Sequence, residues 1–396
     1  MRTPLPRSLA DTLPAPDAAA LAHSHACAEM LRAEINKAGG WLSFARFMEL
    51  ALYTPGLGYY AAGARKFGAE GDFVTAPEIS SLFGQTLASS IADVLRQTGG
   101  DVLELGPGSG KLAKDILLAL DGIGVLPDRY RLLEVSADLR DRQQQALATL
   151  PASLAVRAEW LDALPQHFTG VIIANEVLDV IPAHLVTWRA GGKFERGVAL
   201  NGDDFIWQDV PAAAELSAAM THIQRSWLSN SPADDYLTEV APAVTGLVSS
   251  LAQSMKLGAM LFIDYGFRAA EFYHPSRVTG TLMCHYRHYA HPDPFVYPGL
   301  QDITAHVDFS AVAEAGTAAG LQLAGYTTQA NFLLASGLPD LLAKADPRDP
   351  SHYLPLTNQF QRLVSPAEMG EFFKVIGFTR GEVTIPALAK ARPLPV

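Results

Sequence analysis

The stretch Val102-Leu103-Glu104-Leu105-Gly106-Pro107-Gly108-Ser109-Gly110-Lys111 decides the fold class of this chain. A short apolar run leads into a turn with three glycines, and a second apolar run, Arg131-Leu132-Leu133-Glu134-Val135, follows after a helix-length gap. This pattern is typical of a βαβ unit, in which the glycine turn lies at the carboxyl end of the first strand. An acid near the end of the second strand can then bind a ribose. The sequence therefore predicts a site for a nucleoside cofactor.

The remainder of the chain alternates between strand and helix patterns. Strands are predicted at 102–105, 130–135, 153–157, 170–174 and 259–264, and helices at 109–120, 137–149, 236–255 and 308–320. Segments 321–333 and 367–380 are expected to finish the sheet as an antiparallel pair. Alternation at this spacing predicts an α/β fold with a doubly wound, mostly parallel, seven-stranded sheet of the Rossmann-like type.

Four regions are predicted along the chain. Residues 1–16, rich in Pro and Ala, are expected to form a mobile N-terminal arm, and residues 17–98 an N-terminal helical and lid region with helices at 24–38 and 43–53. The catalytic core is expected to comprise residues 99–182 and 236–396. Between its two parts, residues 183–235 are interpreted as an inserted β-meander and helix, which would contact a substrate or form a homodimer.

The composition argues against several classes of partner. The chain has 396 residues with 41 Asp and Glu against 30 Lys and Arg, a net charge of −11, so a nucleic-acid backbone is a poor ligand. Cys27 and Cys284 are its only cysteines, which suits a reducing compartment. There is no apolar run of about eighteen residues that could span a membrane. We therefore expect a cytoplasmic protein that binds no nucleic acid and does not insert into a membrane.

The glycine turn favours S-adenosyl-L-methionine over a nucleotide phosphate. A phosphate-binding loop needs Gly-Lys-Ser/Thr, whereas Leu112 follows Lys111 here, and a dinucleotide site normally has the spacing GxGxxG. The methionine and ribose of this cofactor need close approach of the backbone, which Gly106 and Gly108 allow. They also need acids that balance the cationic groups of the cofactor and accept hydrogen bonds from its hydroxyls. The predicted cofactor residues are Thr75, Glu104, Gly106, Gly108, Glu134, Asp162 and Asn175. For Asp162, a helix N-cap is an equally good interpretation.

Two acids that follow the fourth strand are the predicted catalytic residues. Val171-Ile172-Ile173-Ala174 runs into Asn175-Glu176-Val177-Leu178-Asp179, and reacting groups in open α/β folds lie beyond the carboxyl ends of strands. In a helical turn, Glu176 and Asp179 would share a face. A pair of carboxylates can bind a guanidinium, which stays protonated in water, and align one nitrogen with a methyl donor. The alternative is a helix cap and a surface acid.

Four further residues are predicted to line the acceptor site: Glu78, Asp264, Tyr265 and His306. Asp264 and Tyr265 end the fifth strand, but the aspartate could instead cap the next turn. His306 precedes Asp308 in what could equally be a helix start, and Glu78 could cap a helix. Residues 284–291 contain Cys284 and three histidines, but their spacing lacks the paired ligands of a zinc site, so no metal is predicted.

Several motifs together resemble the MidA family, bacterial relatives of the mitochondrial arginine methyltransferase that assists assembly of respiratory complex I. The matching segments are Gly71 to Ser80, Glu104 to Gly110, Leu133-Glu134-Val135-Ser136, Ala174 to Asp179, Asp264-Tyr265-Gly266 and Gly280 to Phe309. The resemblance implies a class I S-adenosylmethionine fold with family-specific insertions. It also implies a protein arginine as acceptor, with symmetric dimethylation of a respiratory-complex subunit.

Two other functions remain open from the sequence. One is a methyltransferase that acts on a small molecule, against which the long insertion argues, because extra surface suits a protein acceptor. The other is a non-catalytic assembly factor, which would bind S-adenosyl-L-methionine only structurally or not at all.

Overall fold

The computed structural model describes residues 12–62, 75–190, 192–228 and 235–391. The chain divides into two compact units, each built from three separated segments. The first unit comprises Met1–Phe73, Val180–Pro242 and Tyr273–Ala305, and the second comprises Val74–Asp179, Ala243–Phe272 and His306–Val396. All predicted site residues belong to the second unit.

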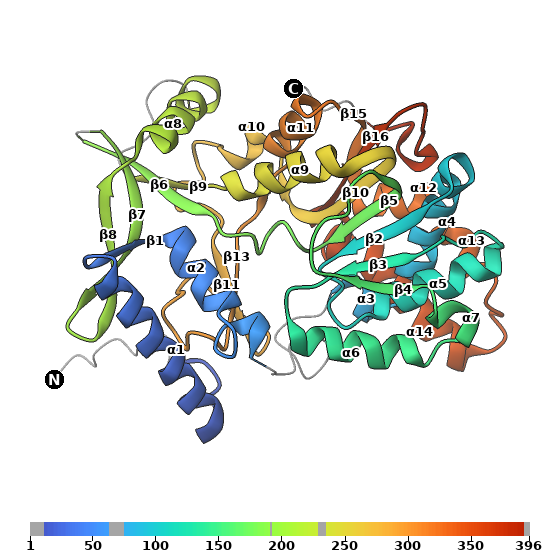
Figure 1. The fold of residues 1–396 in the computed structure, drawn as a ribbon, viewed down its shortest axis with the longest axis horizontal. Coiled ribbons are helices and arrows are strands. Elements are labelled where there is room, and N and C mark those ends of the chain that lie inside the picture. Colours follow the sequence, from blue (N-terminus) through green and yellow to red (C-terminus); the bar gives the residue numbers. More distant parts are fainter. Residues whose placement is uncertain (1–11, 63–74, 191, 229–234, 392–396) are drawn as a thin grey trace. The chain divides into compact units, whose positions relative to one another are not determined.

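The second unit contains an eight-stranded sheet (Figure 1). In spatial order its strands are β15 (Gln322–Thr328), β16 (Phe373–Arg380), β10 (Met255–Phe267), β5 (Phe168–Asn175), β2 (Asp101–Leu105), β3 (Tyr130–Leu133) and β4 (Ala158–Leu161), with β14 (Val307–Asp308) also pairing with β10. Strand β16 runs antiparallel to both β15 and β10, and the other described strand pairs of this sheet are parallel. The predicted α/β class is confirmed. The two-residue strand β14 is an addition that the sequence did not predict.

Helices connect and cover these strands. They are α3 (Ala76–Ile79), α4 (Ser81–Thr98), α5 (Lys111–Ile123), α6 (Ala137–Ala148), α7 (Ala152–Ala155), α9 (Pro242–Ser254), α10 (Ala269–Phe272), α11 (Phe309–Ala318), α12 (Gln329–Ala335), α13 (Leu338–Leu342), α14 (Pro350–Val364), α15 (Met369–Phe372) and the 3-10 helix η3 (Pro386–Leu388). Helix α4 begins after Ser80, whose hydroxyl accepts from the Leu82 N–H, and it ends at Gly99 in the left-handed region.

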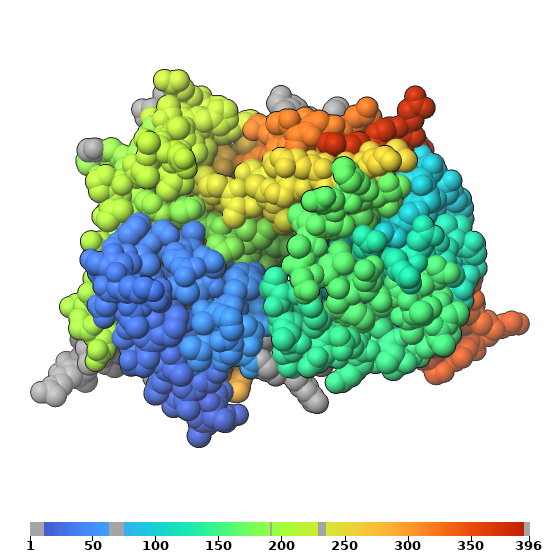
Figure 2. All heavy atoms as spheres, in the orientation of Figure 1, coloured from blue at the N-terminus to red at the C-terminus, as the bar shows by residue number. Residues whose placement is uncertain are grey.

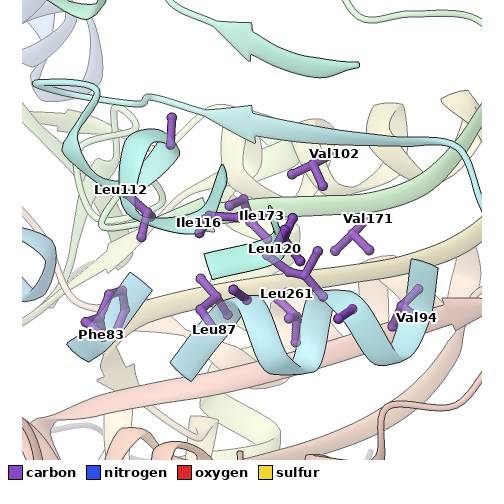
Figure 3. Packing of buried hydrophobic residues seen from close by; sticks show 14 of the residues in the cluster. Phe83, Leu87, Val94, Val102, Leu112, Ile116, Leu120, Val171, Ile173 and Leu261 are labelled. Carbon is purple, nitrogen blue, oxygen red and sulfur yellow. The ribbon is translucent and has the colours of Figure 1, made fainter. Parts of the chain in front are cut away.

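The main core lies between α4, α5 and the sheet (Figure 3). Phe83, Leu87 and Val94 of α4 and Leu112, Ile116 and Leu120 of α5 pack against strand side chains that include Val102, Val171, Ile173 and Leu261. The intervening strand residues Leu103, Ile172 and Met260 point to the opposite face and are also fully buried. Both faces of these strands are therefore covered, as expected for parallel strands that read as continuous apolar runs.

Four predicted elements are wrong in part. The segments 321–333 and 367–380 do form the antiparallel pair β15 and β16, but residues 329–333 belong to helix α12 and residues 369–372 to helix α15. The predicted strand at 153–157 is instead the short helix α7, and β4 begins only at Ala158. The error has a physical reason: β4 is an edge strand with no fully buried residue, so its sequence shows no clear alternation. The predicted helix at 236–255 begins with strand β9 (Tyr236–Val240), and the helix starts at Pro242, where the fixed φ of proline suits the first turn.

The first unit has two antiparallel sheets. Its helices are α1 (Ala18–Lys37), α2 (Phe44–Tyr53), η2 (Tyr59–Ala61) and α8 (Ala214–Trp227). One sheet has the order β1 (Trp41–Ser43), β7 (Gly192–Asn201), β6 (His184–Arg189) and β9, with β8 (Asp204–Pro211) also pairing with β7, and the other has the order β12 (Tyr289–His291), β11 (Met283–Tyr286) and β13 (Asp302–Thr304). No described helix is long and apolar enough to cross a membrane.

The first unit is assembled differently from the predicted regions. The stretch predicted as a meander and helix contains β6, β7, β8 and α8, and the N-terminal strand β1 pairs with β7, so that these segments adjoin (Figure 2). Residues 273–305, which the sequence placed in the core, belong to this unit as well. Residues 1–11 of the predicted arm and 63–74 of the predicted lid region lie outside the described part of the chain.

Candidate functional site

The glycine turn joins β2 to α5 with an unusual backbone. Gly106, Gly108 and Gly110 have φ values of +55°, +56° and +79°, in the left-handed region that side chains disfavour. A Cβ on Gly106 would lie 2.9 Å from Val177 Cγ2, and a Cβ on Gly110 would lie 3.0 Å from the Cα of Gln143. The turn therefore brings bare backbone close to both the segment after β5 and helix α6.

Glu134 lies directly after β3 and is held by two donors. Its Oε1 accepts from the Ser136 N–H at 2.8 Å and its Oε2 accepts from Gln143 Nε2 at 3.0 Å. The same Gln143 amide also donates to the Gly108 carbonyl at 3.0 Å, and its Oε1 accepts from Trp160 Nε1 at 2.9 Å. Since a carboxylate can accept about four hydrogen bonds, Glu134 is oriented by the protein and chemically suited to accept from a ribose.

Glu104 points into the interior from the end of β2. It is 2% exposed and accepts a hydrogen bond of 2.6 Å from the Tyr130 hydroxyl. The pKa of Glu104 is raised to about 7, mainly by burial and also by the nearby Glu134, against the hydrogen bond from Tyr130, which lowers it. The carboxyl can therefore change its protonation state near neutral pH.

Asp162 lies at the surface, after β4. Its side chain is 89% exposed and forms an ion pair of 2.8 Å with Arg140. Arg140 also donates to the main-chain oxygens of Glu134 and Leu161, at 3.0 and 2.9 Å. The aspartate does not cap a described helix, because the segment after β4 is not helical. Arg140 thus connects the residues that follow β3 and β4.

The segment after β5 carries the predicted catalytic residues in a strained backbone. Glu176 has a φ of +54°, and its N–H donates to the Ile263 carbonyl at 2.8 Å. Its Oε1 accepts from Asn175 Nδ2 at 3.1 Å and from the Ala76 N–H at 3.4 Å. A non-glycine residue in the left-handed region is a feature found often at functional sites.

Asp264 holds this segment in place. Its Oδ2 accepts from the N–H groups of Val177, Leu178 and Asp179, at 3.1, 2.8 and 3.3 Å, and its Oδ1 accepts from the Tyr265 N–H at 2.9 Å. Asp264 is therefore a cap, as one interpretation of the sequence expected, but mainly of the segment after β5 rather than of its own turn.

Glu176, Asp179 and Asp264 form a group of three carboxyls, which we call the acid group. Asp179 and Asp264 are 4% and 1% exposed. Burial raises the pKa of Asp264 well above its usual value of 3.8, and the neighbouring Asp179 and Glu176 raise it further. Negative charges crowded in this way are stabilised by a cation placed among them.

The other predicted acceptor residues fall in two places. His306 contacts the rings of Tyr265 and Phe267, each with a centroid distance of 5.1 Å. Glu78 instead accepts a hydrogen bond from Ser109 of the glycine turn, so it lies with the predicted cofactor residues. Thr75 caps α3 through its main chain, because its carbonyl accepts from the N–H groups of Glu78 and Ile79.

The geometry fits a nucleoside cofactor at the glycine turn. The turn backbone, Glu104 and Glu134 converge there, and Asn175 Oδ1 is buried with no hydrogen-bond partner among the described residues. An unsatisfied buried oxygen is costly, so a donor from a ligand at this place would lower the free energy. Within the same described part of the chain, no cluster of three or more His, Cys, Asp or Glu residues could hold a metal.

The sequence analysis missed Gln143, which connects Glu134, Gly108 and Trp160. A signal was present: Leu139, Gln143 and Leu147 recur every four residues and are the buried residues of α6. A polar amide on the apolar face of a helix needs buried hydrogen-bond partners, and its position therefore predicts a polar network. Tyr130 gave no comparable signal, because its apolar ring already explains its place in a strand.

Comparisons with known proteins agree with this geometry. A family model described as "Putative S-adenosyl-L-methionine-dependent methyltransferase" matches residues 86–327. The chain is similar to the protein arginine methyltransferase NDUFAF7 homolog, mitochondrial, of Drosophila melanogaster, at 29% identity over 89% of this chain and 85% of the relative. The corresponding protein of Homo sapiens, also named mitochondrial, is 29% identical over 85% of this chain and 80% of its own length.

A solved structure is more similar still. A crystal structure from Burkholderia thailandensis, with S-adenosyl-homocysteine bound, shares 50% sequence identity with this chain and has a TM-score of 0.91. The match covers 96% of this chain and 98% of that one.

Proposed function

This chain belongs to the family of S-adenosyl-L-methionine-dependent methyltransferases and uses that cofactor, and on this premise we propose that it methylates an arginine side chain of a protein. The observation that carries the proposal is the acid group, in which Glu176 and Asp179 lie beside the buried Asp264. The names of the Drosophila and human relatives support the same acceptor.

The cofactor supplies an electrophilic methyl group on its sulfonium when it is bound. We assign its binding to the residues around the glycine turn. Gly106 and Gly108 allow close backbone approach, Glu134 accepts from the ribose, and Glu104 faces the cationic part of the ligand. Thr75, Asn175 and Asp162 complete the set in this proposal, and Glu78 orients the turn through Ser109.

The acid group acts on the acceptor. A guanidinium stays protonated at neutral pH, and two carboxylates can each accept its N–H groups, which fixes one nitrogen toward the methyl donor. Charge then concentrates on the nitrogens that face Glu176 and Asp179. Transfer replaces one N–H bond with an N–CH3 bond, so one proton leaves, and a carboxylate of this pair can accept it. Tyr265 and His306 line the approach.

The sheet supports this assignment of roles. Without the short β14, seven strands remain in the order β15, β16, β10, β5, β2, β3 and β4, and we propose that they correspond to the doubly wound sheet of class I methyltransferases. The glycine turn then follows β2, and Glu176 and Asp179 follow the neighbouring parallel strand β5, so both lie beyond the carboxyl ends of their strands. The segment 183–235 is proposed to contact the acceptor protein or a second copy.

The test uses tritiated S-adenosyl-L-methionine, the purified full chain and a cell lysate as the source of acceptors, including respiratory-complex subunits. Label recovered as methylarginine after acid hydrolysis supports the proposal. Label on a small molecule or on another residue type overturns arginine as the acceptor, and cofactor binding without any transfer favours a non-catalytic assembly factor.

The variant Glu176→Gln separates catalysis from cofactor binding. It keeps an oxygen that can accept from Asn175 and Ala76, but it removes the charge that binds a guanidinium. We expect methyl transfer to fall by about 100-fold or more, while the affinity for S-adenosyl-homocysteine measured by calorimetry stays nearly unchanged. The matched control is Glu314→Gln, an exposed acid on α11. Normal turnover in Glu176→Gln would remove the carboxylate mechanism.

A further inference from the structure

A polar cavity of about 650 Å³ lies in the second unit, next to the end of β10. Its volume falls in the range of small-molecule sites. The cavity is lined by side chains after β10, along β15 and α12, and around α15, β16 and η3, among them Arg268, Glu271, Tyr326, Asn331, Glu371 and Lys374. None of these residues belongs to the predicted catalytic or cofactor set.

The cavity is close to the acid group in the same sheet. Lys374 of β16 is the direct register partner of Asp264 on β10, and Phe373 is the partner of Tyr265. Directly opposed residues of antiparallel strands have Cα atoms about 5 Å apart. Arg268 directly follows β10. A ligand in the cavity would therefore lie one strand away from the acid group.

The charges of the cavity lining favour an anion. Three cationic side chains, Arg268, Lys374 and Lys390, face two acids, Glu271 and Glu371. Arg268 is already paired with Glu271 at 2.8 Å, so these two charges largely compensate each other. Of the remaining charges, Lys374 and Lys390 are positive and Glu371 is negative, which leaves one positive charge in excess.

Lys374 is the cation best placed for a ligand. Its ammonium donates to the main-chain oxygen of Glu371, and no ion pair within 4 Å is found for it among the described residues. Burial lowers its pKa, although Glu371 and Glu271 act in the opposite direction. A half-buried ammonium has lost part of its hydration, and Glu371 and Glu271 attract it without an ion pair within 4 Å among the described residues, so an incoming anion would compensate that loss.

A buried hydroxyl in the cavity lining gives a second, independent indication. The Tyr326 hydroxyl is buried and has no hydrogen-bond partner in the part of the chain that the structure describes. Burial raises the pKa of Tyr326, so the group stays an O–H donor at neutral pH. Its ring contacts Phe309 with a centroid distance of 5.4 Å, which limits its movement. A donor that is buried without a partner is costly, and an acceptor oxygen from a ligand would satisfy it.

We propose that this cavity is a second binding site, which holds an oxyanion, a carboxylate or a phosphate, between the Lys374 ammonium and the Tyr326 hydroxyl. Asn331 provides an amide on the same side, and Ala335, Ala387 and Ala391 provide small apolar contacts for the rest of the ligand. The site does not depend on which acceptor the enzyme methylates.

The alanines of the lining allow a direct test on the full chain. The protein is labelled with ¹³C at the alanine methyl groups, and spectra are recorded during titration with N-acetyl-L-aspartate, with inorganic phosphate, and with chloride at equal ionic strength. We expect saturable shifts of Ala335, Ala387 and Ala391 with one of the first two probes. The probe that saturates identifies a carboxylate or a phosphate as the ligand group.

Two variants attribute the binding to the proposed groups. Lys374→Gln is expected to weaken it at least tenfold and Tyr326→Phe about threefold to tenfold, as for one lost hydrogen bond. Lys256→Gln, an exposed lysine at the start of β10, should leave it unchanged. S-adenosyl-homocysteine binding in each variant reports intact folding and is independent of the cavity. Shifts that do not saturate, that chloride reproduces, or that saturate with the wild-type affinity in Lys374→Gln and Tyr326→Phe would overturn the proposal.

Discussion

Single residues in this protein act through partners that are distant in sequence. Asp264 accepts three N–H groups from residues 177–179, more than eighty positions earlier, and thereby fixes the segment that carries Glu176 and Asp179. Gln143 likewise joins Glu134 to the glycine turn through one side chain. Removing such a residue leaves several buried polar groups without a partner, so its effect should exceed that of one hydrogen bond.

Glu104 allows a prediction about pH. Burial raises its folded-state pKa from 4.5 to about 7, so the folded protein keeps this proton while the unfolded chain has already lost it. The stabilisation is complete below pH 4.5 and is lost as the pH rises through about 7. We expect the stability of the wild type to fall, relative to Glu104→Gln, by up to about 3 kcal/mol over this range.

Urea unfolding at pH 4.5, 5.5, 6.5 and 7.5 measures this difference. Glu314→Gln serves as the control, because that acid is exposed on α11. An identical pH dependence for the wild type and Glu104→Gln would show that the buried carboxyl titrates normally.

At the scale of elements, the strongly periodic segments were predicted well and the weakly buried ones were not. Strands β2 and β5 and helices α5 and α6 match their predictions closely, because both strands are continuous apolar runs and both helices have clear boundary residues. The edge strand β4 was displaced by several residues. Strand β9 was mistaken for helix, since its pairing with β6 depends on residues about fifty positions away.

Close packing between neighbouring strands gives a prediction at this scale. Gly170 of β5 has a φ of +128°, and a Cβ there would lie 1.9 Å from the Asp101 carbonyl oxygen of β2. Gly170→Ala must therefore separate the strands, and we expect it to destabilise the fold by more than about 3 kcal/mol. The matched control is Gly246→Ala in α9, where a Cβ meets nothing within 4 Å. This change should stabilise the protein by about 0.5–1 kcal/mol.

Thermal and urea unfolding of the two alanine variants provide the measurement. Equal stability of Gly170→Ala and the wild type would mean that β2 and β5 are not packed as closely as described. Strong destabilisation by Gly246→Ala would show that this glycine has a role which its surroundings do not reveal.

At the scale of the whole molecule, the two units differ in the kind of sheet that they contain. The second has the mostly parallel sheet, the glycine turn and the acid group, whereas the first has two antiparallel sheets built around segments far apart in sequence. The residues proposed to bind the cofactor all come from the second unit. Ligand binding should therefore stabilise the second unit directly, by an amount set by concentration and affinity.

Hydrogen exchange with and without S-adenosyl-homocysteine tests this expectation. We expect slower exchange of backbone amides at residues 102–110 and 130–143 when the ligand is present, because these segments contain the turn, Glu134 and Gln143. Strands β6, β7 and β8 of the first unit should exchange at nearly the same rate. Protection confined to those three strands would contradict the assignment of the cofactor site.

The sequence by itself determined the α/β class, the glycine turn, the acid after β3 and the family, because these depend on short patterns with a fixed period or spacing. Only the tertiary structure decided how distant segments combine: the cap by Asp264, the network of Gln143, the pairing of β1 with β7 and the cavity beside Lys374. The physical reason is that buried polar groups and strand edges must find partners wherever the folded chain brings them, and one sequence does not state those long-range pairings.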